Sequence, residues 1–138
     1  MRLLAISLFV LGLGLTVPAQ TIENASRATI GYITSSGTVE NRSRSTIGYI
    51  RDDGAVENGS RSTIGYIREN GTVENRSRST IGYITSSGTI ENASRSTIGY
   101  IRDDGTVEDS SRRTIGYAKG VKLEHAAAFF FFFFQEAR

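Results

Sequence analysis

The side chain with the most direct chemical potential is His125, the only histidine in the 138-residue chain. Imidazole can act as a general base near neutral pH. His125 follows Glu124 and precedes an apolar run, but no other residue lies at a spacing that predicts a partner for it. No serine stands in the Gly-x-Ser-x-Gly motif that many hydrolases use. We therefore predict no catalytic residue, and an enzyme is only the third of three functional alternatives.

Two acidic pairs, Asp52 with Asp53 and Asp103 with Asp104, could supply oxygen ligands to Ca²⁺. A site shared by all repeats would need acidic residues at every equivalent position. Those positions elsewhere hold Ser35 and Ser36, Glu69 and Asn70, and Ser86 and Ser87. The chain also has no cysteine, which excludes disulfides and thiolate metal sites. We therefore predict no metal and no cofactor, and we interpret the acidic pairs as turn residues.

Six tyrosines recur in register and could form an aromatic ladder for stacking on sugars. In a regular strand each tyrosine shares a face with an isoleucine two residues earlier, as Tyr49 does with Ile47. This pattern favours packing in the core or between units over ligand contact. The candidate ligand contacts are Tyr32, Tyr49, Tyr66, Tyr83, Tyr100 and Tyr117.

Each unit also carries a glutamate followed four residues later by an arginine, as in Glu40 and Arg44. Such pairs are either solvated ion pairs or a repeated polar surface for a polymer such as a polysaccharide. Five Asn-x-Ser sequences lie beside them and would be glycosylation acceptors in a eukaryotic secreted protein. We interpret these asparagines as turn residues.

These residues belong to a 17-residue repeat. The sequence Thr-Ile-Gly-Tyr starts at Thr29, Thr46, Thr63, Thr80, Thr97 and Thr114. Six units fill residues 20–122, and each holds two strand-sized runs rich in β-branched and aromatic residues. Pairs such as Asp-Gly and Asn-Gly between the runs indicate tight turns. The sequence predicts an all-β repeat protein of about twelve short strands in antiparallel hairpins.

One unit is too small to fold alone, because it offers only about four large apolar side chains against the ordering of 17 residues. The units must therefore stack, either as a closed, propeller-like flower or as an open β-solenoid. An open stack normally needs a cap at each end. No cap sequence precedes the first unit, which favours the closed ring.

The N-terminus has the organisation of a secretory signal peptide. Arg2 precedes an apolar run over residues 3–15, and Val17 and Ala19 fit the positions before a cleavage site. We predict a signal peptide over residues 1–19 and export to the periplasm, the cell surface or the extracellular space. An uncleaved anchor is the alternative, although the run is shorter than the ~20 residues of a spanning helix.

The C-terminal tail, residues 123–138, contains six consecutive aromatic residues that must be buried somewhere. They are Phe129, Phe130, Phe131, Phe132, Phe133 and Phe134. The tail could plug the ring, make an intermolecular contact or insert into a membrane surface. Neighbouring alanines favour helix and the phenylalanines favour strand, so its conformation stays open.

The recurring Thr-Ile-Gly-Tyr-Ile-x-x-x-Gly-Thr-Val-Glu motif, with a signal sequence before it and a phenylalanine-rich tail after it, resembles the five-fold β-flower family of secreted Bacteroidota proteins. The resemblance implies five petals of short antiparallel strands around an axis, and it implies no enzymatic mechanism. Six units are present, so this chain has either six petals or one unit outside the ring. The last unit, residues 106–122, diverges most.

Basic residues number 16 and acidic residues 14, and the two signs are interspersed, which excludes the usual electrostatic binding of nucleic acid. We predict a secreted, non-enzymatic structural or interaction repeat protein of bacterial origin. The alternative is a carbohydrate-binding module that uses the repeated polar and aromatic face. Expected partners are a second copy or a cell-envelope component bound through the tail, or a polysaccharide.

Overall fold

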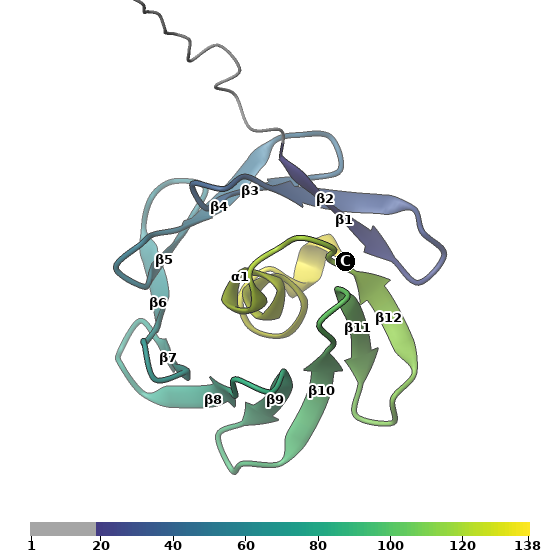
Figure 1. Cartoon of the computed structure of the whole chain (residues 1–138). Helices are drawn as coiled ribbons and strands as arrows, with labels where there is room; N and C mark the ends of the chain where they lie inside the picture. Colours follow the sequence, from purple (N-terminus) through teal and green to yellow (C-terminus); the bar gives the residue numbers. More distant parts are fainter. Residues whose placement is uncertain (1–18) are drawn as a thin grey trace, which may run out of the picture.

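The computed structural model describes residues 19–138 and forms a closed ring of twelve antiparallel strands (Figure 1). The predicted signal peptide, except for Ala19, lies outside the described residues. The strands are β1 (Gln20–Asn24), β2 (Thr29–Ile33), β3 (Thr38–Asn41), β4 (Thr46–Ile50), β5 (Ala55–Asn58), β6 (Thr63–Ile67), β7 (Thr72–Asn75), β8 (Thr80–Ile84), β9 (Thr89–Asn92), β10 (Thr97–Ile101), β11 (Thr106–Asp109) and β12 (Thr114–Tyr117).

Each strand pairs with its neighbours along the chain, and β1 pairs with β12 to close the ring. In this closing pair, Glu23 lies opposite Tyr117 and Asn24 opposite Gly116. The all-β prediction and the closed ring are confirmed, and the open solenoid is wrong. All six hairpins lie in the ring, so no unit is left outside it. Closure pairs the two strands that would be exposed edges in an open stack.

One end of the barrel carries turns with a glycine that needs a positive φ. We call residues 34–37, 51–54, 68–71, 85–88 and 102–105 the Gly loops. Their glycines have φ between 90° and 94°, a region that side chains rarely allow. In one loop Gly54 donates to the Arg51 carbonyl at 2.9 Å, and Ile67 donates to the Gly54 carbonyl at 2.8 Å. The second bond ties each loop to the next hairpin.

The opposite end carries turns organised by asparagine. We call residues 25–28, 42–45, 59–62, 76–79, 93–96 and 110–113 the Asn loops. Asn41 Oδ1 accepts from the backbone N–H of Ser43 at 2.9 Å and of Ser45 at 3.0 Å. Asp109 makes the same two bonds in the last loop. These contacts confirm the predicted turn role.

In each pair of strands joined by an Asn loop, the second strand contains a β-bulge. The bulge changes which side chains share a face. Between β3 and β4, Val39 lies opposite Gly48 and Glu40 opposite Thr46, which leaves Ile47 without a direct partner. Ile47 therefore packs against the core, while Tyr49 is half-buried on the outer wall. The expectation that these two side chains share a face is wrong, because it assumed unbroken alternation.

The interior of the barrel is filled by the tail, which lies inside the ring in Figure 1. The tail forms α1 (Leu123–Ala127), a π-helical turn η2 (Ala128–Phe132) and a 3₁₀ turn η3 (Gln135–Ala137). It is therefore helical rather than extended. Its alanines and phenylalanines form one hydrophobic cluster with the inward side chains of the strands.

Candidate functional site

The interior contains a one-to-one match between phenylalanines and hairpins. We call Phe129 to Phe134 the hub. A Cβ atom added to the glycine of any Thr-Ile-Gly-Tyr segment would lie within 2.8 Å of a ring carbon of one hub residue. The pairs are Gly31 with Phe129, Gly116 with Phe130, Gly99 with Phe131, Gly82 with Phe132, Gly65 with Phe133 and Gly48 with Phe134. Each ring therefore rests on the bare backbone of a different hairpin.

The widened backbone of the hub explains how consecutive residues reach consecutive hairpins. The N–H groups of Phe133 and Phe134 both donate to the Ala128 carbonyl, at 2.9 and 3.2 Å. These five- and six-residue spacings give a wider turn than an α-helix. Six rings shared among six hairpins imply about 60° per residue, against about 100° in an α-helix. The hub thus places one side chain in front of each glycine in turn.

The hub leaves no open lumen for a ligand. Phe129 and Phe130 are fully buried, and their rings meet edge to face at 5.5 Å between centroids. Phe131 and Phe134 are buried, whereas Phe132 and Phe133 are partly buried. Of the three fates predicted for the tail, the structure places it inside its own barrel. No helix within residues 19–138 combines the length and apolarity needed to cross a membrane.

The outer wall carries the six tyrosines, each covered by an arginine from a neighbouring unit. Arg44 Cζ lies 4.0 Å from the centre of the Tyr32 ring, and Arg44 Nε lies 3.1 Å from Glu40 Oε1. The six arginine–tyrosine distances range from 3.6 to 4.0 Å, and the pair of Arg27 with Tyr117 completes the ring. We call these six Tyr–Arg–Glu groups the wall triads.

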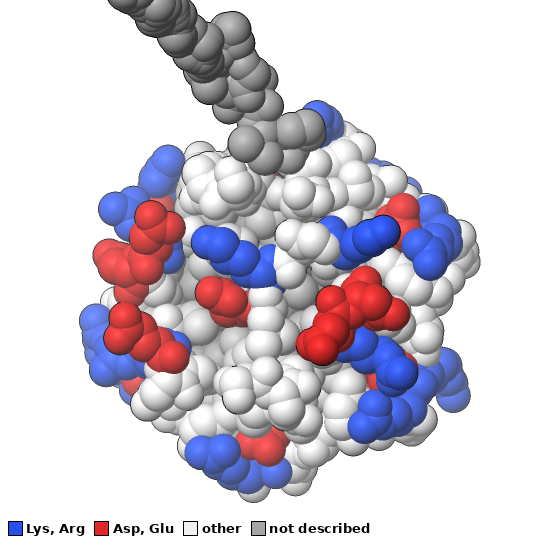
Figure 2. Space-filling view, viewed as in Figure 1, with Lys and Arg blue, Asp and Glu red and all other residues white. Residues whose placement is uncertain are grey.

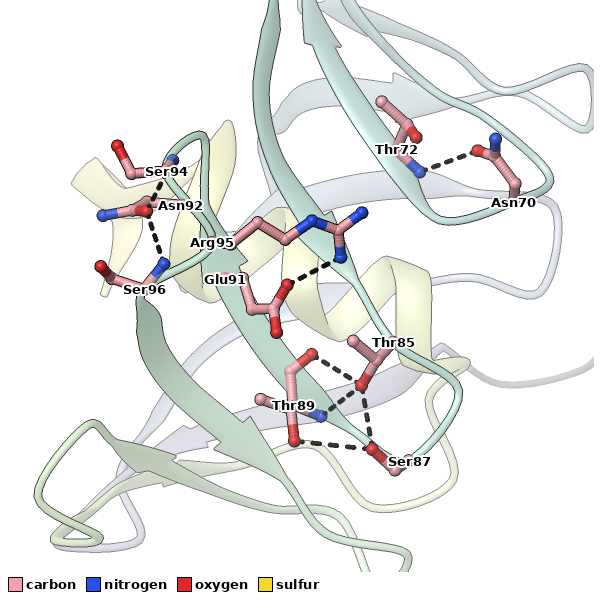
Figure 3. A network of polar contacts seen from close by, with 10 residues as sticks. All are labelled: Asn70, Thr72, Thr85, Ser87, Thr89, Glu91, Asn92, Ser94, Arg95 and Ser96. Carbon is pink, nitrogen blue, oxygen red and sulfur yellow. Dashed lines mark hydrogen bonds and ion pairs between the residues drawn. The ribbon is translucent and has the colours of Figure 1, made fainter.

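The Asn loops position the wall triads. Each triad arginine has φ between 67° and 70°, a left-handed conformation uncommon outside glycine. Figure 3 shows Arg95 reaching Glu91 beside the loop that Asn92 fixes through Ser94 and Ser96. The sequence indicates the glutamate–arginine pairs, but it does not indicate that these arginines stack on tyrosine. The constant spacing from Tyr32 to Arg44 is the signal that could have revealed it.

The mouth of the barrel, where the tail enters, holds a cavity of about 450 Å³. It lies between the Gly loops 51–54 and 68–71 and the start of α1, and His125 lines it. His125 is 7% exposed, and its burial lowers the pKa of the imidazole below the usual value. The charges of Glu124 and Asp52 oppose this shift, and Lys122 reinforces it.

The mouth does not bring together a recognisable reaction centre within residues 19–138. No hydrogen bond joins His125 to another described side chain, and no described group of three or more His, Asp or Glu residues could hold a metal ion. Basic and acidic side chains are interspersed on the face seen in Figure 2. The cavity offers mixed charges without a nucleophile and base in contact.

The acidic pairs occupy Gly loops and serve their turns. Asp53 Oδ1 accepts from the Ala55 backbone N–H at 3.0 Å. Asp104 Oδ1 accepts from Thr106 at 2.9 Å, and this bond holds the pKa of Asp104 below its usual value. The predicted turn role of these residues is confirmed.

A closed barrel of six near-identical hairpins around a helical plug defines an all-β, flower-like repeat protein. A sequence model of the 5-fold beta-flower protein family matches residues 19–134. The chain belongs to this family. The family is described as five-fold, whereas this member closes six hairpins. No match was found among curated proteins or among solved structures.

Proposed function

We propose that this chain is an exported, non-enzymatic structural or interaction module that contacts a cell-envelope partner through its outer wall. The observation that carries the proposal is the filled interior. Barrels of this kind commonly hold small ligands in the lumen. Here the hub occupies that space, and its rings lie against the strand backbone. The folded monomer must therefore meet a partner on its outer surface.

The wall triads supply a repeated, rigid set of contact groups. The side chain of each triad arginine is 54 to 66% exposed, although it is fixed by a carboxylate and an aromatic ring. Stacked arginines lose little freedom on binding. Six similar groups around a ring suit a partner with repeated anionic or hydrogen-bonding groups, because several weak contacts then act together. The predicted signal peptide supports export.

A carbohydrate-binding module is the second candidate. Sugars commonly stack on an open aromatic face, but an arginine already lies over each tyrosine ring. A polysaccharide would instead receive hydrogen bonds from the exposed arginines. This geometry makes a repeated polar polymer a more suitable ligand than a single sugar ring.

Fractionation of cells that export the chain tests the proposal. The variant Arg44→Gln/Arg78→Gln/Arg112→Gln removes three triad arginines. The control Arg42→Gln/Arg76→Gln/Arg113→Gln removes the same charge from the same Asn loops at positions for which no ion pair is recorded. We expect the parent and the control in the envelope fraction and the triad variant in the soluble fraction. An equal distribution of all three would contradict the proposal.

A polysaccharide array probed with the same three proteins separates the two candidates. Binding to a polysaccharide by the parent and the control, lost in the triad variant, supports the carbohydrate-binding module. Envelope retention without polysaccharide binding supports a protein partner. Thermal unfolding of all three proteins shows whether the substitutions leave the barrel intact.

A further inference from the structure

The tail and the barrel meet without hydrogen bonds. Within residues 19–138, each hydrogen bond recorded for residues 123–138 joins two tail residues or a tail residue to Lys122. Examples are Ala126 N–H to the Lys122 carbonyl at 2.9 Å and Gln135 Nε2 to the Phe131 carbonyl at 2.8 Å. The strands pair among themselves. The tail is therefore a self-contained helical ligand, held by apolar contact with a self-contained receptor.

The segment that joins the tail to β12 has the properties of a hinge. It comprises residues 118–122, of which Lys119, Gly120 and Lys122 are exposed. Gly120 has a φ of 77°, and one backbone bond, from Val121 to the Ala118 carbonyl at 3.1 Å, spans the turn. A different path for these few residues would leave every hub contact unchanged. Short, exposed hinges next to a terminal element favour exchange of that element between copies.

We propose that the lumen is a peptide-binding site that also accepts the hub of a second copy of this chain, so that two chains exchange tails and form a dimer. In such a dimer each barrel still presents six glycines to six phenylalanines. The closed and exchanged forms therefore share nearly all contacts and differ in the hinge and at any new surface between the barrels. The inference goes beyond the proposed function and does not depend on it.

Exchange is expected during folding rather than in the finished barrel. The hub contacts glycines in all six hairpins, so it cannot leave without exposing much of the core. During folding, the hub of the same chain competes with the hubs of other chains. The intramolecular event does not depend on concentration, whereas the intermolecular event does. The ratio of dimer to monomer should therefore follow the concentration at which the chain refolds.

Refolding of residues 20–138 from denaturant at low and at high concentration tests the proposal, with the mass measured by light scattering after size exclusion. We expect monomer after dilute refolding and a dimer fraction that rises roughly in proportion to concentration. Dilution of the folded dimer should not release monomer, whereas unfolding followed by dilute refolding should. Monomer at every concentration would overturn the proposal.

Two hinge variants separate tail exchange from ordinary association. Deletion of Gly120 shortens the path into the same barrel and should raise the dimer fraction. Insertion of Gly-Ser-Gly after Gly120 relaxes that path and should lower it. Association that is equal in both variants and in the parent would mean that the barrels meet by another surface, which also overturns the proposal.

A matched pair of hub variants gives a second test that needs no hinge change. In Gly99→Ala the new methyl group meets both the Phe131 ring and the Glu108 carbonyl, and in Phe131→Ala the ring is absent, which relieves the first of these two contacts. When the two chains refold together, an exchanged heterodimer contains two different barrels. One barrel carries Gly99→Ala and holds the Phe131→Ala tail, and the other barrel and its tail are both unsubstituted. Native mass spectrometry should show a heterodimer share well above the half of all dimers that random pairing gives.

The control mixes Gly99→Ala with Phe130→Ala, whose missing ring belongs to Gly116. In this heterodimer the Phe130→Ala tail still carries Phe131 into the Gly99→Ala barrel, so the clash is not relieved and the three dimers should form in statistical proportion. Equal heterodimer fractions in the two mixtures would overturn tail exchange. Both experiments use soluble protein alone, so their outcome is independent of the envelope fractionation.

Discussion

At the scale of single residues, glycine and phenylalanine determine each other. The inward glycine of each hairpin is needed because a ring and a backbone carbonyl both approach the position of a Cβ atom. A Cβ atom added to Gly82 would lie 2.5 Å from the Glu91 carbonyl oxygen and 2.5 Å from a Phe132 ring carbon. Neither atom can move freely, because the carbonyl belongs to the sheet and the ring to the hub. The glycine therefore serves close approach rather than an unusual φ.

Gly82→Ala is expected to lower the free energy of unfolding by about 1–3 kcal/mol through overpacking. Gly59→Ala is the control, because this glycine lies in an Asn loop where other repeats hold Ala, Ser or Arg. It should change stability by no more than about 0.5 kcal/mol. Urea unfolding measures both variants. Equal effects would show that the hub does not need the glycines.

The buried imidazole at the mouth predicts a pH dependence of stability. Burial lowers the pKa of His125 in the folded chain, so the unfolded chain binds a proton at a higher pH than the folded one. The contribution of the neutral His125 imidazole to the free energy of unfolding should be fully present above its pKa in the unfolded chain, about 6.5. This contribution should be lost as the pH drops toward the lower pKa of the folded chain. Thermal unfolding between about pH 7.5 and 5.5 spans the ordinary pKa of an imidazole and measures this effect.

His125→Gln removes the titrating group and serves as the reference for that measurement. Its melting temperature should change less than that of the parent over the same pH range. The charges of Glu124 and Asp52 favour the protonated imidazole, and the charge of Lys122 opposes it. All three residues are kept in both proteins, so the comparison concerns the imidazole alone. Identical pH profiles would contradict the assignment.

At the scale of elements, the loops decide where the strands stop and where the arginines point. Asn75 Oδ1 accepts from Ser77 and Ser79 N–H groups, both at 3.0 Å, and this fixes the turn between β7 and β8. Arg78, three residues after Asn75, then takes a left-handed φ, and its Cζ atom lies 3.9 Å from the centre of the Tyr66 ring. One side-chain oxygen thus sets both a turn and a wall contact.

Asn75→Ala is expected to cost about 0.5–1.5 kcal/mol of stability, because two turn bonds are lost and water replaces them only in part. Asn75→Asp should cost less, since Asp109 makes the same bonds in the last loop. The triad with Tyr66 should loosen only in the alanine variant, which tyrosine fluorescence can follow. An equal loss in both variants would contradict the role given to this oxygen.

Strands and turns could be predicted from the sequence because their signals are local. Alternation and the Asp-Gly and Asn-Gly pairs indicate hairpins wherever they lie. The bulge at Ile47 could not be predicted, since both neighbouring faces carry apolar residues and alternation gives no contrast there. The stacking of Arg44 on Tyr32 needs the left-handed φ of the arginine, which no local preference indicates. The mouth cavity depends on where the tail turns inward.

At the scale of the whole molecule, ring closure and plug depend on each other. The six-fold ring has a lumen that a single α-helix of small residues would leave partly empty, and the hub fills it with side chains. The sequence held a signal for this match, because six phenylalanines follow six repeats. Its meaning becomes visible only once the ring is closed, since an open stack would give the rings no common centre.

Deletion of one hub phenylalanine is expected to destabilise the barrel by about 3–5 kcal/mol, because Gln135 then replaces a buried ring at Gly48. Since the six residues are identical, any one deletion gives the same chain. Deletion of Glu136, an exposed residue of the same tail, is the control and should change the melting temperature little. Similar losses in both chains would show that tail length, rather than the match of ring to hairpin, matters.

The match between hub and hairpins also constrains how such a gene can evolve. Duplication of 17 codons adds a hairpin whose glycine has no phenylalanine to contact. Loss of a hairpin leaves one phenylalanine without a glycine. A change in symmetry therefore requires two separate mutations, one in the repeats and one in the tail that follows them. In a five-bladed relative of this construction the run should be five aromatic residues long. The number of consecutive phenylalanines in the tail thus equals the number of hairpins in the barrel, and insertion or deletion of a single codon is enough to break the match.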